Sequence, residues 1–262
     1  MSDLEDCEQS FSYLLESAAE QLRSGVDVAS SFQAIETAQR VLATCALLGQ
    51  ADPDLFVERL DRSATARWHL LRQVAAGTSC EPRGIAATRA LGFFAALASG
   101  NLTLASWIAD LLARSHAPEW EYEEDFLFVD FLRHAALGLS AGGPWAPAAA
   151  TNLARWEQVL DGRDSATAAA CKAVALADGP AFASSFEAVL AKRLRDLQAY
   201  RSEVSFDRQA YAVEGHVYIE GIALLEVAER SGLPVESQYP LIPSLARAKR
   251  SQRSGESPDW MR

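Results

Sequence analysis

Apolar residues recur at helical spacing along almost the whole chain, at positions i, i+3, i+4 and i+7. No segment shows the sustained alternation of apolar and polar residues that is typical of a strand. We therefore predict an all-α fold of about ten helices, stacked as irregular antiparallel hairpins in one large domain. The spacing predicts helices over residues 4–23, 30–48, 52–77, 85–98, 101–112, 119–139, 147–160, 165–177, 180–197 and 207–232.

Glycine, proline and capping residues mark the ends of these helices. Asp52-Pro53 reads as an N-cap followed by a first-turn proline, and Gly100-Asn101 as a stop followed by a new cap. Residues 141–147 form the most linker-like stretch and are a candidate subdivision of a domain that spans residues 1–243. We expect residues 244–262 to be a flexible tail with a basic cluster made of Arg247, Lys249, Arg250 and Arg253.

The most apolar of the predicted helices runs from an N-cap at Asp207 to a stop at Gly232. Apolar side chains cover most of its circumference, which is typical of a helix buried between other helices. We predict that it is the central helix of the domain. Gly215 and Gly221 each cost a helix about 1 kcal/mol relative to alanine, so we expect another backbone to pack closely against them.

Two carboxylates, Glu214 and Glu220, fall within the apolar arc of this helix. A buried carboxylate without a partner costs several kcal/mol or stays protonated. We therefore expect both to be buried structural carboxylates paired with an arginine such as Arg89 or Arg193. The alternative interpretation is that they belong to a functional site.

The segment before residue 130 combines acidic and aromatic side chains. It includes Glu119, Trp120, Glu121, Tyr122, Glu123, Glu124 and Asp125. One interpretation is structural, because acids in the first turn favour the helix dipole and aromatic side chains fill the core. The other is a docking surface for a basic protein, since acids speed association with a positive partner and Trp or Tyr anchors the contact.

Composition and charge narrow the classes of function. A net charge of −11 disfavours nucleic acids and anionic membranes as partners and favours a basic protein. The acidic start has neither the basic nor the apolar part of a secretory signal, so we expect a cytoplasmic protein. The four cysteines are scattered, and Cys45 and Cys171 are expected to be small core residues.

No catalytic, cofactor or metal motif stands out, so we predict neither an enzyme nor a cofactor. His216 and Glu220 lie one helical turn apart, but no third ligand accompanies them at a recognisable spacing. A helical enzyme that uses Glu214, His216 and Glu220 is kept as a rival hypothesis. It predicts bound metal or a deep polar pocket at that helix.

The C-terminal half resembles the immunity protein 49 family, all-helical antidotes of bacterial polymorphic toxin, contact-dependent or type VI secretion systems. The resemblance rests on residues 177–182 with Leu190 and Leu194, and on residues 213–215, 219–225, 228–233 and 240–243. The N-terminal half is similar only in its alanine-rich helical character, and the basic tail has no counterpart that we expect in the family.

The resemblance implies binding and neutralisation of one cognate toxin encoded by an adjacent gene, without catalytic residues. A cytoplasmic antidote suggests a toxin with a cytoplasmic target, for example a nuclease. On charge alone, Glu121, Glu123, Glu124 and Asp125 are then candidates to mimic phosphate in a basic active site. The alternative is a helical-repeat scaffold that binds several partners and neutralises none.

Overall fold

The computed structural model describes residues 3–248, and in this range the chain is helical, without strands. Eleven helices of seven residues or more occur, together with a single α-helical turn, α4, and two 3₁₀ turns, η1 and η2. The elements are α1 Asp3–Ser24, α2 Val28–Gln50, α3 Pro53–Ala75, α4 Pro82–Ile85, η1 Ala87–Arg89, α5 Leu91–Ala98, α6 Leu102–Leu111, α7 Glu123–Ser140, α8 Ala146–Leu160, α9 Ala166–Ala175, α10 Gly179–Tyr200, α11 Arg208–Glu214, α12 Ile219–Arg230 and η2 Ser244–Arg247. The predicted all-α class is confirmed.

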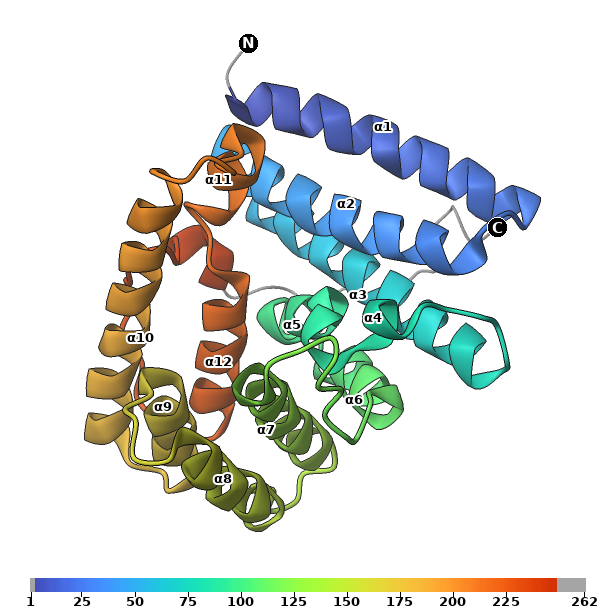
Figure 1. Cartoon of the computed structure of the whole chain (residues 1–262). Coiled ribbons are helices and arrows are strands. Elements are labelled where there is room, and N and C mark those ends of the chain that lie inside the picture. Colours follow the sequence, from blue (N-terminus) through green and yellow to red (C-terminus); the bar gives the residue numbers. More distant parts are fainter. Residues whose placement is uncertain (1–2, 249–262) are drawn as a thin grey trace.

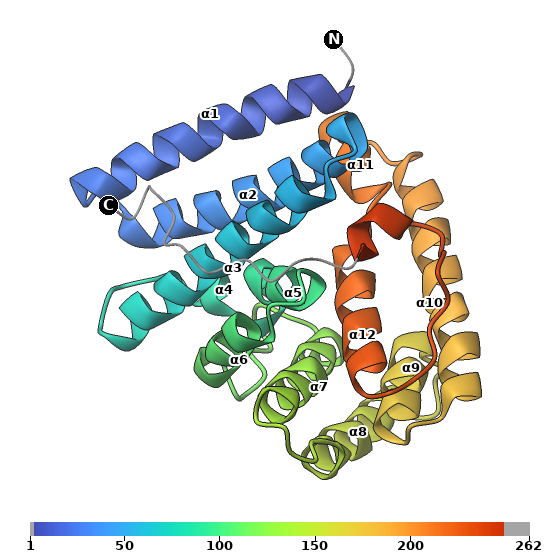
Figure 2. The same ribbon diagram turned by 180° about the vertical axis from the view of Figure 1, so that it is seen from behind.

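Helices α1, α2 and α3 lie side by side and are joined by very short turns, so that neighbours run antiparallel (Figures 1 and 2). The remaining helices curve away from this layer, with α10 on the far side from α5 and α6. Helix α12 lies inside this arrangement and contacts α5, α7 and α9. Eight of its residues are buried, so the prediction of a central helix is correct for this part of the 207–232 segment.

At several helix N-termini a side chain accepts a hydrogen bond from a backbone N–H group of the first turn, as the sequence indicates. The Asp52 carboxylate accepts from the Leu55 N–H at 2.8 Å, and the Asn101 side chain accepts from the Leu104 N–H at 3.1 Å. Gly100 precedes that cap with φ of 76°, a left-handed conformation that glycine adopts without strain. These local signals set the borders between α2 and α3 and between α5 and α6.

The segment 207–232 is two helices, which corrects the prediction of one. Asp207 caps α11 as expected, but the helix ends at Gly215, and α12 begins at Ile219. The Tyr218 N–H donates instead to the Leu241 carbonyl at 2.8 Å. No second backbone packs on Gly221 in this region; its close neighbour is the Tyr218 ring, 2.5 Å from where a Cβ would lie.

The stretch 141–147 does not divide the molecule. Trp145 is buried, and the position of a Cβ on Gly138 would fall 2.2 Å from the Trp145 Cβ, so the chain packs tightly across this turn. One hydrophobic cluster runs from Ala43 to Ala246 and includes residues on both sides of the turn. We therefore treat the described chain as one domain.

The fold also extends beyond residue 243, the end of the domain that the sequence predicts. Ala246 in η2 is 1% exposed and belongs to the main core. Arg247 lies over the Tyr239 ring at 5.8 Å, and its Nη1 donates to the Glu236 carbonyl at 2.5 Å. The other three members of the predicted basic cluster, Lys249, Arg250 and Arg253, lie outside the described residues.

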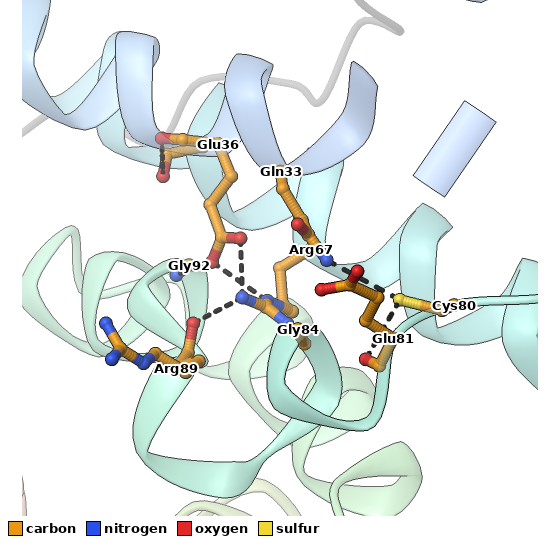
Figure 3. Close-up of polar contacts among 9 residues, drawn as sticks. Gln33, Glu36, Arg67, Cys80, Glu81, Gly84, Arg89 and Gly92 are labelled. Carbon is orange, nitrogen blue, oxygen red and sulfur yellow. Dashed lines mark hydrogen bonds and ion pairs between the residues drawn. The ribbon is translucent and has the colours of Figure 1, made fainter. Parts of the chain in front are cut away.

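A buried ion pair joins α2 to α3 (Figure 3). An Nη2–Oε2 distance of 2.7 Å separates Arg67 from Glu36, whose side chains are 3% and 2% exposed. Arg67 Nη1 also donates to the Gly84 carbonyl at 2.9 Å, and its Nη2 donates to the Arg89 carbonyl. The Gly92 N–H donates to Glu36. This network fixes the irregular segment 84–92 against α2 and α3.

Candidate functional site

The turn before α7 is organised around Glu121, which points inward rather than toward solvent. Its residue is 9% exposed, and its carboxylate accepts the Ala117 N–H at 3.1 Å and the Thr88 N–H at 3.0 Å. His116 Nε2 lies 2.8 Å from the Glu121 carbonyl oxygen. One side chain thus satisfies two backbone donors and holds residues 117–122 in a fixed turn.

The buried network of Figure 3 anchors the segment that donates to Glu121. Arg67 holds the carbonyls of Gly84 and Arg89, and Thr88 of η1 lies between these two residues in the chain. Thr88 then gives its N–H to Glu121. The segment that Arg67 anchors in the core is therefore also the segment that Glu121 binds.

Fixing the turn in this way leaves two large aromatic side chains in solvent. Trp120 is 42% exposed, and Tyr122 is 82% exposed. Glu119 beside them is exposed as well. Exposed Trp and Tyr on a rigid turn lose little conformational entropy when a partner covers them, and both residues are enriched among interface hot spots. We call residues 117–122 the aromatic turn.

The acids that follow the aromatic turn have partners within the chain, which the sequence did not reveal. Glu123 pairs with Arg155 of α8 at 2.7 Å, and Glu124 pairs with Arg163 at 2.7 Å. Both arginines are more than half exposed, so these pairs are weak and can exchange partners. Asp125 is exposed.

This arrangement corrects the phosphate-mimic hypothesis for part of the run. Glu121 is buried and occupied by two backbone N–H groups, so it is not presented to a partner. Glu123 and Glu124 are half-buried and paired with Arg155 and Arg163, so they reach a partner only when these weak surface pairs open. Of the acids in the predicted segment, Glu119 and Asp125 are the exposed ones.

A groove of about 450 Å³ between α8, α9 and α10 adjoins this region. Arg163 lines the groove and also holds Glu124, so the groove and the start of α7 share a side chain. Sequence reasoning missed Arg155 and Arg163 because nothing local connects them to residues more than 30 positions away.

We predict that Glu121→Ala destabilises the protein by about 2 kcal/mol, because it leaves two partly buried N–H groups without an acceptor. Amide hydrogen exchange should accelerate at Ala117 and Thr88, the two donors to Glu121. Glu119→Ala is the matched control, since Glu119 is exposed on the same turn, and its effect should stay below about 0.5 kcal/mol. Equal effects of the two substitutions would show that Glu121 does not hold the turn.

The two carboxylates expected to be buried on the central helix differ in exposure and in their partners. Glu220 has an Oε1–Nη2 distance of 2.6 Å to Arg40, and the side chains are 21% and 11% exposed. The Glu214 side chain is 61% exposed and lies 3.6 Å from Arg193, so the expectation of a buried Glu214 is wrong. The expected pairing with Arg193 is found for Glu214, whereas the hydrogen-bonded partner of Glu220 is Arg40 of α2.

Electrostatics at the Arg40–Glu220 pair follow from this geometry. Burial alone would raise the pKa of Glu220, but the charge and hydrogen bond of Arg40 outweigh it and lower the pKa. Burial, followed by the charge of Glu220, raises the pKa of the nearby Tyr218 phenol above its usual value. The carboxylate is therefore held ionised as a structural link between α2 and α12.

The pocket that Glu214 lines does not include the other two residues of the rival enzyme hypothesis. Glu214 lines a small pocket of about 240 Å³ with Arg193 and Tyr211, while His216 and Glu220 are not part of its lining. His216 is exposed. Between residues 3 and 248 no group of three or more His, Cys, Asp and Glu side chains is arranged to hold a metal ion.

The described helices include none that combines the length and apolar character needed to cross a membrane. A search of family models, of curated proteins and of solved structures gave no match to this chain.

Proposed function

We propose that this chain is an immunity-type binding protein that recognises one cognate toxin and neutralises it. The observation that carries the proposal is the aromatic turn. Its buried Glu121 accepts two backbone N–H groups, and its Trp120 and Tyr122 side chains are exposed. Trp and Tyr are the residue types that most often dominate the binding energy of protein interfaces, and here a buried carboxylate holds both on one turn.

The charge of the chain supports a basic partner. The net charge of −11 accelerates association with a positive protein, and the exposed Glu119 and Asp125 flank the aromatic pair. The surface pairs Glu123–Arg155 and Glu124–Arg163 can open and offer their carboxylates to arginines of the partner. The aromatic contacts then provide most of the affinity, and the acidic side chains raise the association rate.

The resemblance of residues 177–243 to the immunity protein 49 family supports the antidote role in particular. Much of this segment is core: Phe182, Phe186 and most of α12 are buried. The C-terminal half then supplies the scaffold, while the aromatic turn, which lies outside it, supplies the specificity. Such a division fits an antidote family in which each member meets a different toxin.

The proposal is tested by co-expression with the product of the adjacent upstream gene, followed by size-exclusion chromatography. We expect that product to be toxic alone, and harmless and co-eluting when this chain is present. A neighbour that is harmless alone, or that does not bind, would remove the antidote function. Binding of several unrelated proteins without loss of toxicity would favour the scaffold alternative.

The contribution of the aromatic turn is tested separately with Trp120→Ala/Tyr122→Ala. Loss of two hot-spot side chains should weaken binding about 100-fold or more, at about 1.4 kcal/mol for each factor of ten. The matched control is Tyr13→Ala/Trp107→Ala, which removes an exposed Tyr and an exposed Trp from α1 and α6. The control variant should bind as the wild type does and still protect against toxicity.

A further inference from the structure

Two cysteines far apart in the sequence, Cys7 of α1 and Cys45 of α2, lie together beside α11. They share a small apolar cluster with Val213, in which all three residues are at most 5% exposed. Each thiol shifts the pKa of the other, in opposite directions. Both are free thiols in this structure.

The other two cysteines provide a contrast within the same chain. Cys171 is buried in the main core, and Cys80 lies near the Gln33 amide at 3.5 Å. Neither belongs to the cluster that holds Cys7 and Cys45. The pairing is thus a property of the α1–α2 contact.

The two thiols are not equivalent. The hydrogen bond from Cys45 lowers the pKa of the Cys7 thiol, against the opposing effects of burial and of the Asp207 charge. The same hydrogen bond, together with burial, raises the pKa of Cys45. Cys7 is therefore the thiol that ionises and reacts first, and Cys45 is the resolving thiol.

Helix α1 gives reagents a route to this pair. It lies at the edge of the molecule and begins at Asp3, so Cys7 is in its second turn (Figure 1). Only three of its 22 residues are buried, namely Cys7, Ala18 and Ala19. A helix end held by so little buried surface opens locally at low cost, and such opening exposes Cys7 without unfolding the domain.

We infer that Cys7 and Cys45 form a redox-sensitive site at which a peroxide converts the thiol pair into a disulfide that ties α1 to α2. The Cys7 thiolate attacks the peroxide, its sulfur gains one oxygen as the O–O bond breaks, and hydroxide leaves. The Cys45 sulfur then attacks the resulting sulfenic acid, the S–S bond forms and water leaves. Two thiols and one hydrogen peroxide give one disulfide and two waters.

The disulfide closes a loop of roughly 40 residues and restricts the unfolded chain. Such a loop should raise the melting temperature by roughly 5–10 °C in a domain of this size. Its position also clamps α1, which contacts both α2 and α11. Oxidation therefore stabilises the contact of α1 with α2.

The test uses the full chain with Cys80→Ser/Cys171→Ala, which keeps only the pair. After treatment with hydrogen peroxide, the thiols titratable in denaturant should fall from two to none, and the intact mass should drop by two hydrogens. The product should migrate as a monomer, melt at the higher temperature, and revert fully with dithiothreitol. Adding Cys45→Ser to this variant should abolish the loss of two hydrogens and the rise in melting temperature, and Cys7 should gain oxygen instead.

Peptide mapping of the peroxide-treated wild type provides a second measurement that does not depend on the folding of any variant. It should recover the peptides of Cys7 and Cys45 joined to each other, with Cys171 unmodified. Three results would overturn the inference: two thiols that persist, Cys7 that ends as sulfinic acid without a crosslink, or crosslinks found only between chains.

Discussion

Replacing Arg67 with methionine should lower the free energy of unfolding by about 3–5 kcal/mol, the largest effect of a single substitution that we expect in this protein. The side chains of Arg67 and Glu36 are 3% and 2% exposed, so Glu36 would remain as a buried charge without its cation. The carbonyls of Gly84 and Arg89 would lose their donor as well. Each polar group left without a partner carries a desolvation cost, because water does not hydrogen-bond to it inside the core.

The matched control is Arg62→Met on the same helix. Arg62 pairs with Glu58 one turn away, and both side chains are more than a third exposed, so its loss should cost less than about 1 kcal/mol. Urea denaturation of both variants measures the difference directly. If the two substitutions cost the same, the Glu36–Arg67 pair would not be the anchor that we describe.

A double-mutant cycle separates the pair from its surroundings. Glu36→Leu combined with Arg67→Met removes both charges, and the double variant should be more stable than the sum of the single losses predicts. Part of the loss should persist, because the Gly92 N–H also depends on Glu36. The destabilisation that remains in the double variant measures how much the network contributes to the stability of segment 84–92.

Replacing Glu220 with leucine should cost about 2–4 kcal/mol, since it leaves Arg40 buried without its anion. The range lies below that for Arg67 because the Glu220 side chain keeps 21% exposure, which weakens the pair. Glu214→Leu is the matched control on the preceding helix. Its side chain is 61% exposed, so its effect should stay within about 1 kcal/mol.

The same pair gives stability a defined dependence on pH. Arg40 holds the pKa of Glu220 below its usual value of 4.5, so the folded state binds this proton more weakly than the unfolded chain does. The contribution of Glu220 is therefore complete above about pH 4.5 and falls as acid drives the pH through the lowered pKa. The stability difference between wild type and Glu220→Leu should shrink below pH 4.5, and an unchanged difference would contradict an ionised buried Glu220.

Local signals in the sequence predicted most of the helices and many of their borders. The segment 85–98, predicted as one helix, contains η1 and α5, and the helix predicted over 119–139 begins only at Glu123. Asp52, Asn101 and Asp207 all cap helices as their positions indicate, because an N-cap depends on neighbours three residues away. The break between α11 and α12 could not be predicted in this way. It depends on the Leu241 carbonyl, which accepts the Tyr218 N–H from more than 20 residues away.

The candidate site was predicted only in part, for the same physical reason. The sequence shows a run of acids and aromatics but not which of them faces inward, since Glu121 is fixed by Thr88 and Ala117 through contacts set by the fold. The arginine partners of Glu123 and Glu124 come from α8 and from the turn after it. Pairing of charged side chains depends on tertiary contacts, whereas helix spacing and caps depend on neighbouring residues.

We propose that the aromatic turn is the surface that binds the cognate toxin. The most direct test is a calorimetric titration of the purified product of the adjacent upstream gene with wild type, Trp120→Ala/Tyr122→Ala and Tyr13→Ala/Trp107→Ala. We expect nanomolar or tighter binding of the wild type and of the control variant, and binding about 100-fold or more weaker for the aromatic-turn variant. Equal affinity of all three proteins, or no binding by the wild type, would contradict the claim.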